Sequence, residues 1–388
     1  MLKSIRLVLP FAILSAILVS GTAFGDDWPY YRGPNRNGVA DVRLDLLDEP
    51  EELWKADVGS GRGSMVISGG KLYVHGKNSE GKNVNCLDAK TGEVLWTVNL
   101  ETWFADSTPA VADGKLYAIG STNDPQAYCL DAASGKEIWK TKLPKNTGTR
   151  HYGHAGSPLI AGDLVVFNTG TGAALNRRTG KTVWEFPGLP GLATPVLFRQ
   201  GGKPAVAIFC GDKLIARNLA DGKQLWSIDW KTNLHVNACD PVFIDDDSKV
   251  FICSDYGFGR ALYDISGDEP RELWNHGRNG DGHAYSSGFF VDGKLYGFVR
   301  DFCRLDTSDG AIDEKVTSHG SALYLGDTLV LLTGNGVLRA GKFKDGQFEP
   351  AYQQRVIDRG TPNVPAYADG KLFVRNEDGV IAALKISR

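Results

Sequence analysis

Three histidines stand in similar short phrases at separate places in the chain. The phrases are Gly153-His-Ala-Gly-Ser157, Gly282-His-Ala-Tyr-Ser286 and Ser318-His-Gly-Ser321. A neutral imidazole can bind a metal ion, act as a general acid or base, or hydrogen-bond an anionic ligand, because its pKa lies near neutrality. The phrases therefore predict a ligand site, provided that the fold brings the three histidines together.

Further polar residues stand at comparable places in the chain. The candidate ligand-binding residues are Arg150, His151, His154, His235, Asp240, Asp255, His283, Arg300 and His319. They could hold a metal ion, or an anionic or polar ligand together with Arg150 and Arg300. The simpler explanation is a polar, hydrated surface where packed strands begin.

The spacing of these residues does not identify a reaction. No His-x-x-x-His pair with a carboxylate partner occurs, so we expect no metal. A Gly-x-Ser-x-Gly nucleophile motif is also missing. Asn168-Thr-Gly-Thr-Gly172 is rich in glycine, but no helix is expected after it, which argues against a phosphate site. The sequence therefore assigns no catalytic and no cofactor-binding residue.

The elements that position these residues are set by a repeat. Tryptophan recurs every 42–48 residues, at Trp54, Trp96, Trp139, Trp184, Trp226 and Trp274. Four of them close similar phrases, of which Leu-Asp-Ala-Lys-Thr-Gly-Glu-Val-Leu-Trp (87–96) is an example. A period of about 40–45 residues indicates one supersecondary unit repeated around an axis. We expect each tryptophan to pack at the outer edge of its unit against the next sheet.

One unit can be read strand by strand. Residues 107–112, 115–120, 127–131 and 136–140 alternate with the turns Asp113-Gly114 and Ser134-Gly135. Four antiparallel strands joined by tight turns describe one blade of a β-propeller. The first hairpin turn recurs in every unit, at Gly69-Gly70, Asp113-Gly114, Gly162-Asp163, Gly201-Gly202, Asp246-Asp247, Asp292-Gly293, Gly326-Asp327 and Asp369-Gly370.

The fold class that follows is all-β, an eight-bladed β-propeller of four-stranded antiparallel blades. The eighth unit has only three strands before the chain ends, and the strand at residues 52–56 precedes the first unit. We expect residues 52–56 to complete blade eight and remove the open sheet edges. In such a disc the segments joining blades lie on one face, called the top here. All seven histidines, including His75 and His276, should gather there, around the central channel.

Residues outside the repeat divide into two segments. Residues 1–25 combine Lys3 and Arg6 with a short apolar run and small residues, which is typical of a signal peptide. A retained membrane anchor is the alternative, although a span needs about 20 apolar residues. Residues 26–51 are expected to pack on the propeller, which occupies residues 52–388. The mature protein is then periplasmic or secreted, monomeric and without a stable membrane span.

Charge and cysteines limit the partners further. The chain has 388 residues and a net charge of −3 with scattered basic residues, so we expect no nucleic-acid partner. Cys86 and Cys129 recur at one place in adjacent blades, which lie about 10 Å apart, too far for a disulfide. Cys239 and Cys253 flank a predicted hairpin and could form a bridge. A register shift of one residue would instead put them on opposite faces.

The Leu-Asp-x-x-Thr-Gly-x-x-x-Trp phrase resembles the repeat of quinoprotein-type β-propellers. The opening Trp28-Pro-Tyr-Tyr-Arg-Gly-Pro-Asn-Arg-Asn-Gly38 resembles the start of secreted PQQ-binding-like repeat proteins. The superfamily includes dehydrogenases that bind pyrroloquinoline quinone (PQQ) and an outer-membrane assembly lipoprotein that binds no cofactor. The resemblance implies the propeller fold, and it leaves the activity open.

The dehydrogenase features of that superfamily have no match here. This chain has no adjacent cysteine pair, no Cys-x-x-Cys-His haem motif and no stretch matching the Glu, Asn and Asp that hold calcium beside the quinone. We therefore expect a non-catalytic binding scaffold, closer to the assembly-type propellers and without a cofactor, which presents its top face to a protein, peptide or polysaccharide in the cell envelope. The alternatives are a quinoprotein-like oxidoreductase with PQQ and calcium, and a lyase or hydrolase that uses His154 and His283.

Overall fold

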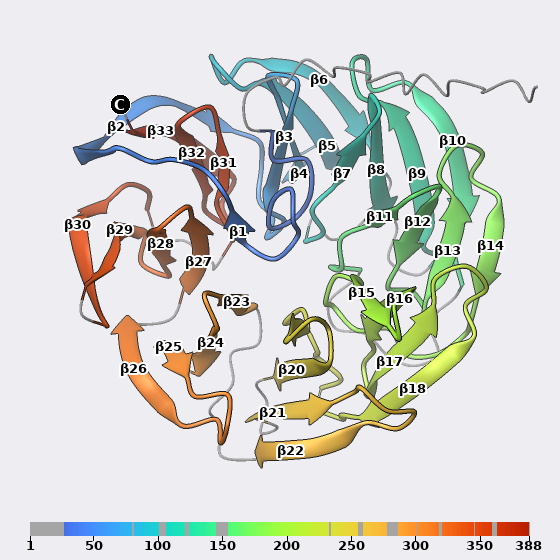
Figure 1. The fold of residues 1–388 in the computed structure, drawn as a ribbon. Helices are drawn as coiled ribbons and strands as arrows, with labels where there is room; N and C mark the ends of the chain where they lie inside the picture. Colours follow the sequence, from blue (N-terminus) through green and yellow to red (C-terminus); the bar gives the residue numbers. More distant parts are fainter. Residues whose placement is uncertain are drawn as a thin grey trace, which may run out of the picture.

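The computed structural model describes most of residues 27–387. The described ranges are 27–79, 81–100, 106–120, 124–144, 154–232, 234–254, 259–277, 286–299, 301–317, 320–344, 346–358 and 363–387. These residues form eight β-sheets around a central axis (Figure 1). No helix occurs among them. The expectation of an all-β, eight-bladed propeller is therefore confirmed.

Each of the first four blades runs from an inner strand near the axis to an outer strand at the rim. Their strands are β3 (Met65–Ser68), β4 (Lys71–Asn78), β5 (Gly81–Asp88) and β6 (Val94–Asn99); β7 (Ala110–Ala112), β8 (Lys115–Gly120), β9 (Gln126–Asp131) and β10 (Glu137–Lys142); β11 (Leu159–Ala161), β12 (Leu164–Phe167), β13 (Ala173–Asn176) and β14 (Thr182–Glu185); and β15 (Val196–Gln200), β16 (Lys203–Phe209), β17 (Lys213–Asn218) and β18 (Gln224–Asp229).

Blades five to eight complete the disc in the same order. Their strands are β19 (Val242–Ile244), β20 (Lys249–Ser254), β21 (Gly259–Asp264) and β22 (Arg271–His276); β23 (Phe289–Val291), β24 (Lys294–Val299), β25 (Asp301–Leu305) and β26 (Ile312–Thr317); β27 (Gly320–Leu325), β28 (Thr328–Thr333), β29 (Val337–Lys344) and β30 (Gln347–Arg355); and β31 (Ala366–Ala368), β32 (Lys371–Arg375), β33 (Val380–Ser387) and β2 (Leu46–Asp57).

The two ends of the chain meet in blade eight. β2 pairs antiparallel with β33, and Trp54 lies opposite Ala383. The expected closure by residues 52–56 is confirmed. The strand also starts earlier than expected, at Leu46, so residue 52 falls inside it. Two register shifts, between Leu46 and Glu51 and between Glu52 and Trp54, separate this first half from the regular pairing.

The hairpin turns follow the residue types at their centres. Where both central residues have positive φ, as at Asp113-Gly114, the turn is the mirror-image type that matches strand twist. At Gly162-Asp163 and Gly326-Asp327 only the glycine has positive φ, which is the pattern of the other hairpin type. Glycine or aspartate at the second position therefore distinguishes the two types, since the Gly-Gly turns 69–70 and 201–202 also have positive φ at both residues.

Blade five differs from the expected Asp246-Asp247 turn. Ile244 pairs with Lys249, so the loop has four residues, and Asp245, Asp246 and Asp247 all have positive φ. Ser248 closes this loop, because its backbone N–H and its hydroxyl both donate to the Asp245 carbonyl. Without a glycine, the longer loop spreads the left-handed turn over three aspartates, which tolerate that conformation better than most residues.

Five tryptophans each connect one blade to the next. Trp139 Nε1 donates to the Arg177 carbonyl at 3.1 Å, and Trp54, Trp96, Trp184 and Trp274 make the same bond to the turn of the following blade. Trp226 instead donates to Gln200 Oε1 at 2.8 Å. These contacts confirm the expected packing at the outer edge of the blades.

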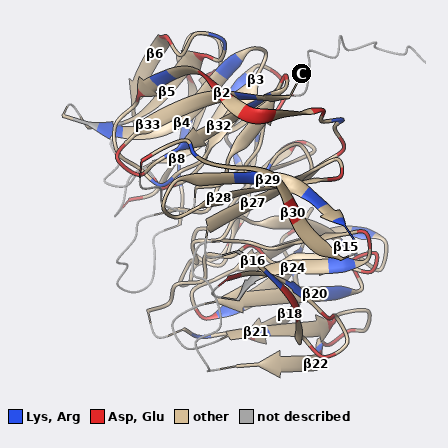
Figure 2. Ribbon diagram, turned by 90° about the vertical axis from the view of Figure 1, so that its left-hand side faces the viewer, with Lys and Arg blue, Asp and Glu red and all other residues tan. Residues whose placement is uncertain are grey.

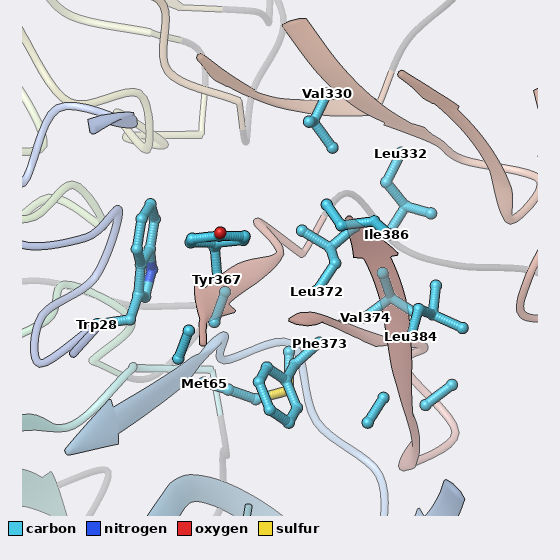
Figure 3. Close-up of a cluster of buried hydrophobic side chains, with 14 of the residues drawn as sticks. Trp28, Met65, Val330, Leu332, Tyr367, Leu372, Phe373, Val374, Leu384 and Ile386 are labelled. Atoms are coloured by element: carbon cyan, nitrogen blue, oxygen red, sulfur yellow. The ribbon is translucent and has the colours of Figure 1, made fainter. Parts of the chain in front are cut away.

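The core lies between neighbouring blades. The largest group of buried apolar side chains spans blades seven, eight and one and includes Trp28 from the N-terminal segment. Figure 3 shows Trp28 beside Tyr367, with Met65 and Phe373 close by. Trp28 is 2% exposed, and burying a tryptophan removes about 150–250 Å² from water. The N-terminal segment is therefore part of the core.

Residues 28–40, called the channel segment below, cross the inner edges of the blades. Trp28 pairs with Ile67 of blade one, the Pro29 carbonyl accepts from Val111 of blade two, and Arg36 donates to the Ile160 carbonyl of blade three. The segment ends as β1 (Val39–Ala40), which pairs parallel with β27 of blade seven. Its blue ribbon loops toward the middle of the disc in Figure 1. The channel segment thus lies against the inner strands of several blades, toward the middle of the disc.

Candidate functional site

The inner strands begin beneath the top face, where the candidate site was expected. A belt of hydrogen bonds links six blades there, each from a backbone N–H to a side-chain oxygen of the next blade. The bonds run from Ser64 to Thr108 (2.9 Å), Thr108 to Ser157 (3.1 Å), Ser157 to Thr194 (3.3 Å), Thr194 to Asp240 (2.8 Å) and Asp240 to Ser287 (2.7 Å).

All six belt residues are buried. The side-chain oxygens of five of them, all but Ser64, satisfy the backbone N–H groups that would otherwise be left unpaired where the inner strands start. The belt therefore has a structural role, and its hydroxyl groups are already engaged. Asp240 is its single carboxylate.

Asp240 binds the channel segment from inside the channel. Its Oδ1 accepts from the Thr194 N–H, and its Oδ2 lies 3.9 Å from Arg32 Nη1. Arg32 also donates to the carbonyls of Asn37 at 2.8 Å and of Gly288. Both side chains of the ion pair are 3% exposed. Asp240 therefore forms a buried ion pair with Arg32, while its Oδ2 accepts no hydrogen bond from the described residues.

Burial dominates the electrostatics of this anchor. It raises the pKa of Asp240 to about 6, although the charge of Arg32 and the hydrogen bond from Thr194 act in the opposite direction. Burial, followed by the charge of Asp240, also raises the pKa of the neighbouring Tyr31 phenol. The charge of Asp240 thus changes just below neutral pH.

His154 and His235 lie in joining segments, as expected. His154 is buried three residues before the belt residue Ser157. His235 is partly exposed and has a φ of 54° in a turn, where its Nδ1 lies 3.3 Å from the Gly211 carbonyl. This contact occupies one ring nitrogen of His235.

His75 and His276 play other roles. His75 is 1% exposed, and burial together with the charge of Arg375 lowers its pKa to about 3, so it is neutral. His276 is exposed at the end of β22, where its Nε2 lies 2.6 Å from the Asp309 carbonyl in a turn between the third and fourth strands of blade six. His276 therefore lies on the outer strand of blade five, against the neighbouring blade, and not beside the inner strands at the channel.

The remaining candidates lie outside the described residues. They are Arg150, His151, Asp255, His283, Arg300 and His319. Their convergence at the channel mouth therefore remains a prediction.

The described residues do not fit a calcium-bound quinone. Among them, no three His, Cys, Asp or Glu side chains come together as a possible metal site. Calcium needs six to eight oxygen ligands, several of them carboxylates, whereas the belt offers a single carboxylate, that of Asp240, which faces the positive charge of Arg32. This disagreement argues against PQQ with calcium at the level of the belt.

Sequence reasoning did not identify Arg32 or Arg375. Arg375, at the end of β32, is fully buried and donates to the carbonyls of Gly63 and Gly59 at 2.7 and 2.9 Å, holding the loop that joins blade eight to blade one. Both arginines act on carbonyl groups far away in sequence. The belt did have a local signal, because Thr108, Ser157, Thr194 and Asp240 each precede a proline.

Surface charge is mixed. In the side view of Figure 2, basic and acidic residues alternate over strands and turns. Many of them form exposed ion pairs, such as Lys142 with Asp124 (3.1 Å) at the top and Arg178 with Asp163 (3.2 Å) at the bottom. No helix among the described residues is long and apolar enough to cross a membrane.

Comparison with known proteins gives one family. The family model described as outer membrane protein assembly factor BamB matches two overlapping ranges, residues 40–123 and 80–315. The protein of that name from Yersinia pestis is 26% identical over 376 residues, which cover 86% of this chain and 88% of that protein. The one from Burkholderia pseudomallei is 28% identical over 189 residues, and the match spans 45% of each.

Solved structures show the same fold in proteins of different activity. The structure of BamB from Moraxella catarrhalis has a TM-score of 0.63 and 15% identity, and the match covers 87% of this chain and 98% of that one. A quinohemoprotein alcohol dehydrogenase from Comamonas testosteroni has a TM-score of 0.66 and 14% identity, covering 93% and 80%. At such identities the likeness concerns the fold alone.

Proposed function

Since the chain belongs to the family of the outer membrane protein assembly factor BamB, we propose that it is an exported, non-catalytic scaffold of the cell envelope. Its top face binds a protein partner that takes part in building the outer membrane. In this proposal residues 1–25 direct export, and the mature protein works in the periplasm.

The position of the channel segment carries the proposal. The channel segment contacts inner strands of blades one, two, three and seven, and its Arg32 is neutralised by Asp240. A cofactor or substrate would have to displace the chain's own core residues, including the buried Trp28. A partner would then bind to the surface of the disc and not inside a cavity.

The placement of His235 supports a binding role. One ring nitrogen is held by the Gly211 carbonyl, so the orientation of the ring is set before a partner arrives. Side chains fixed in this way lose less conformational entropy on binding. The predicted top-face residues Arg150, His151, His283, Arg300 and His319 would extend the same surface.

Site-specific photocrosslinking in native envelopes tests this proposal. A photoreactive amino acid replaces Lys142 at the top or Arg178 at the bottom, two exposed residues that each form a single ion pair with an aspartate. We expect a crosslink from position 142 to a protein of the outer-membrane assembly machinery, and none from position 178. Crosslinks of equal yield from both faces, or none from position 142 or a second top position, Arg62, would overturn the proposal.

The alternative is a quinoprotein-like oxidoreductase with PQQ and calcium. We expect no saturable change in the absorbance of PQQ when the purified protein is titrated with PQQ and calcium. A stoichiometric change would favour the oxidoreductase and would replace the scaffold. For a lyase or hydrolase, His154→Ala and His283→Ala would have to abolish turnover of a glycan without unfolding the protein.

A further inference from the structure

Two cysteines meet where blade five begins. Cys239 lies just before the belt residue Asp240, and Cys253 lies near the end of β20, the second strand of that blade. Both are buried, and all six cysteines of the chain are free thiols. The other four occupy β5, β9, β25 and the residue after β16.

The strand register explains how the two thiols come together. Val242 pairs with Phe251, which puts Asp240 and not Cys239 opposite Cys253 if the ladder is continued past Pro241. The chain departs from the ladder before Pro241, however, and both cysteines pack in the same apolar group between blades five and six. Cys239 Sγ donates to the Ser286 carbonyl of blade six at 3.3 Å, and the two thiols are hydrogen-bonded to each other.

Cys303 is the nearest alternative partner. It belongs to the same apolar group, but its thiol lies 3.4 Å from the carbonyl of Asp301 in its own strand. Cys86, Cys129 and Cys210 belong to three other apolar groups. Cys239 and Cys253 therefore contact each other, whereas the other four cysteines have different neighbours.

We propose that Cys239 and Cys253 form a redox pair that closes into an intramolecular disulfide in an oxidising compartment. The two thiols give up two protons and two electrons as the S–S bond forms, and a disulfide oxidant such as oxidised glutathione takes them up to become two thiols. The closed loop contains about 15 residues, a length at which a crosslink markedly restricts the unfolded chain.

The burial of the two thiols determines when the disulfide forms. A buried, protonated thiol is a poor nucleophile, and hydrogen bonding and burial raise the pKa of Cys239 well above its usual value. The bond therefore forms while the protein folds, before blade six covers the pair. The disulfide fixes Cys239, the residue next to Asp240, and so keeps Asp240 in position to pair with Arg32.

Thiol counting and peptide mapping test the pair. The protein is refolded in a glutathione redox buffer or in a fully reducing buffer, and free thiols are counted after denaturation. We expect four thiols after oxidative folding and six after reducing folding. Trypsin cuts after Lys249, between the two cysteines, so a crosslinked pair of peptides, 232–249 with 250–260, identifies the bond in the unreduced digest.

Matched variants separate the pair from general oxidation. Cys253→Ala should keep all its thiols under oxidising conditions, whereas Cys86→Ala should lose two, as the wild type does. The wild type should melt several degrees higher when oxidised than when reduced, and Cys253→Ala should melt at one temperature in both buffers. Six thiols in the oxidised wild type, or a crosslink to the Cys303 peptide, would overturn the inference. The peptide map decides even if a variant fails to fold.

Discussion

The glycine of each Asp-x-x-Thr-Gly turn faces the tryptophan of the preceding blade. A Cβ added at Gly180 would lie 2.7 Å from the Trp139 ring, and one at Gly92 would lie 2.6 Å from the Trp54 ring. The aspartate or asparagine of the same turn accepts hydrogen bonds from the backbone, as Asn176 Oδ1 does from Thr179 at 3.0 Å. The repeated phrase is therefore a docking surface for a neighbouring blade.

This docking can be tested with two glycines of similar backbone conformation. Gly180 has a φ of 72° and contacts Trp139, whereas Gly114 has a φ of 68° and open space around it. Gly114→Ala should cost about 1 kcal/mol in the free energy of unfolding, from backbone strain alone. Gly180→Ala should cost a further 1–3 kcal/mol or so, because the methyl group displaces the indole. Chemical denaturation measures both, and equal losses would contradict the docking role.

At the scale of single residues, the sequence predicted which types of residue pack between blades, but it did not predict which residues they contact. The spacing of the tryptophans predicted packing against the next sheet, and Trp139 does pack there. The glycine it touches lies some forty residues further on, and only the closed geometry shows that contact. The site was predicted from histidines, yet Asp240 is engaged by Arg32, which belongs to a segment without any repeat to align.

Among the elements, β2 has two halves with different functions. Residues Trp54 to Asp57 pair regularly with β33. Before them, Glu51 and Glu52 pair with Lys385 and Leu384, and Leu46 alone pairs with Ser387. β2 also approaches the outer strand of blade seven, where residues 44–46 line a cavity of about 560 Å³ together with residues of β29 and β30. The second half of β2 closes the ring of blades, and the first half precedes it as a less regularly paired segment.

Replacing each half of β2 by alternating glycine and serine distinguishes them. The change at residues 52–57 should destabilise the protein by several kcal/mol, since it removes Trp54 and leaves the edge of β33 open to other chains. The same change at residues 46–51 should have a much smaller effect. Thermal unfolding and size-exclusion chromatography report stability and aggregation. Similar behaviour of the two variants would argue against closure by the second half.

The residue types in the hairpin turns made the strands predictable from the sequence. Asn, Asp or Gly at the centre of a hairpin specifies its geometry within a few residues, so the strand order followed from the sequence. The exceptions also have local causes. The turn of blade five lengthened because no glycine stands among Asp245, Asp246 and Asp247, and β2 began early because register shifts let an irregular segment join the sheet.

On the scale of the molecule, the channel segment connects distant blades through Arg32 and Asp240. Burying an ion pair is costly, and removing one partner leaves an uncompensated charge that typically costs about 3–5 kcal/mol. The sequence predicted that this segment packs on the propeller. It could not predict a path through the axis, because an irregular Pro- and Gly-rich chain has no periodicity that fixes its position.

The pH dependence of stability tests this anchor. The pKa of Asp240 is about 6 in the folded protein, above its ordinary value of 3.8, so the folded state binds the proton more tightly than the unfolded state between these values. The contribution of Asp240 to stability therefore grows as pH falls from 6 to 4 and is lost as pH rises. Relative to Asp240→Asn, the wild type should gain on the order of 2 kcal/mol between pH 7 and pH 4.5. Denaturant unfolding at the two pH values measures the gain.

Arg32→Gln serves as the control for that experiment. Without the guanidinium, the pKa of Asp240 should rise further, and the gain should begin at higher pH. A difference between wild type and Asp240→Asn that does not change with pH would show that the carboxylate is not buried as described.

The joining of β2 to β33 has a further consequence for how the polypeptide matures. A chain that emerges from its N-terminus delivers β2 first, and its partner arrives last. Throughout translation and translocation, the nascent protein therefore carries an unmatched strand and a lengthening stack of incomplete sheets. Such intermediates are prone to misassembly, so we expect a late, concerted folding step and a dependence on chaperones during passage.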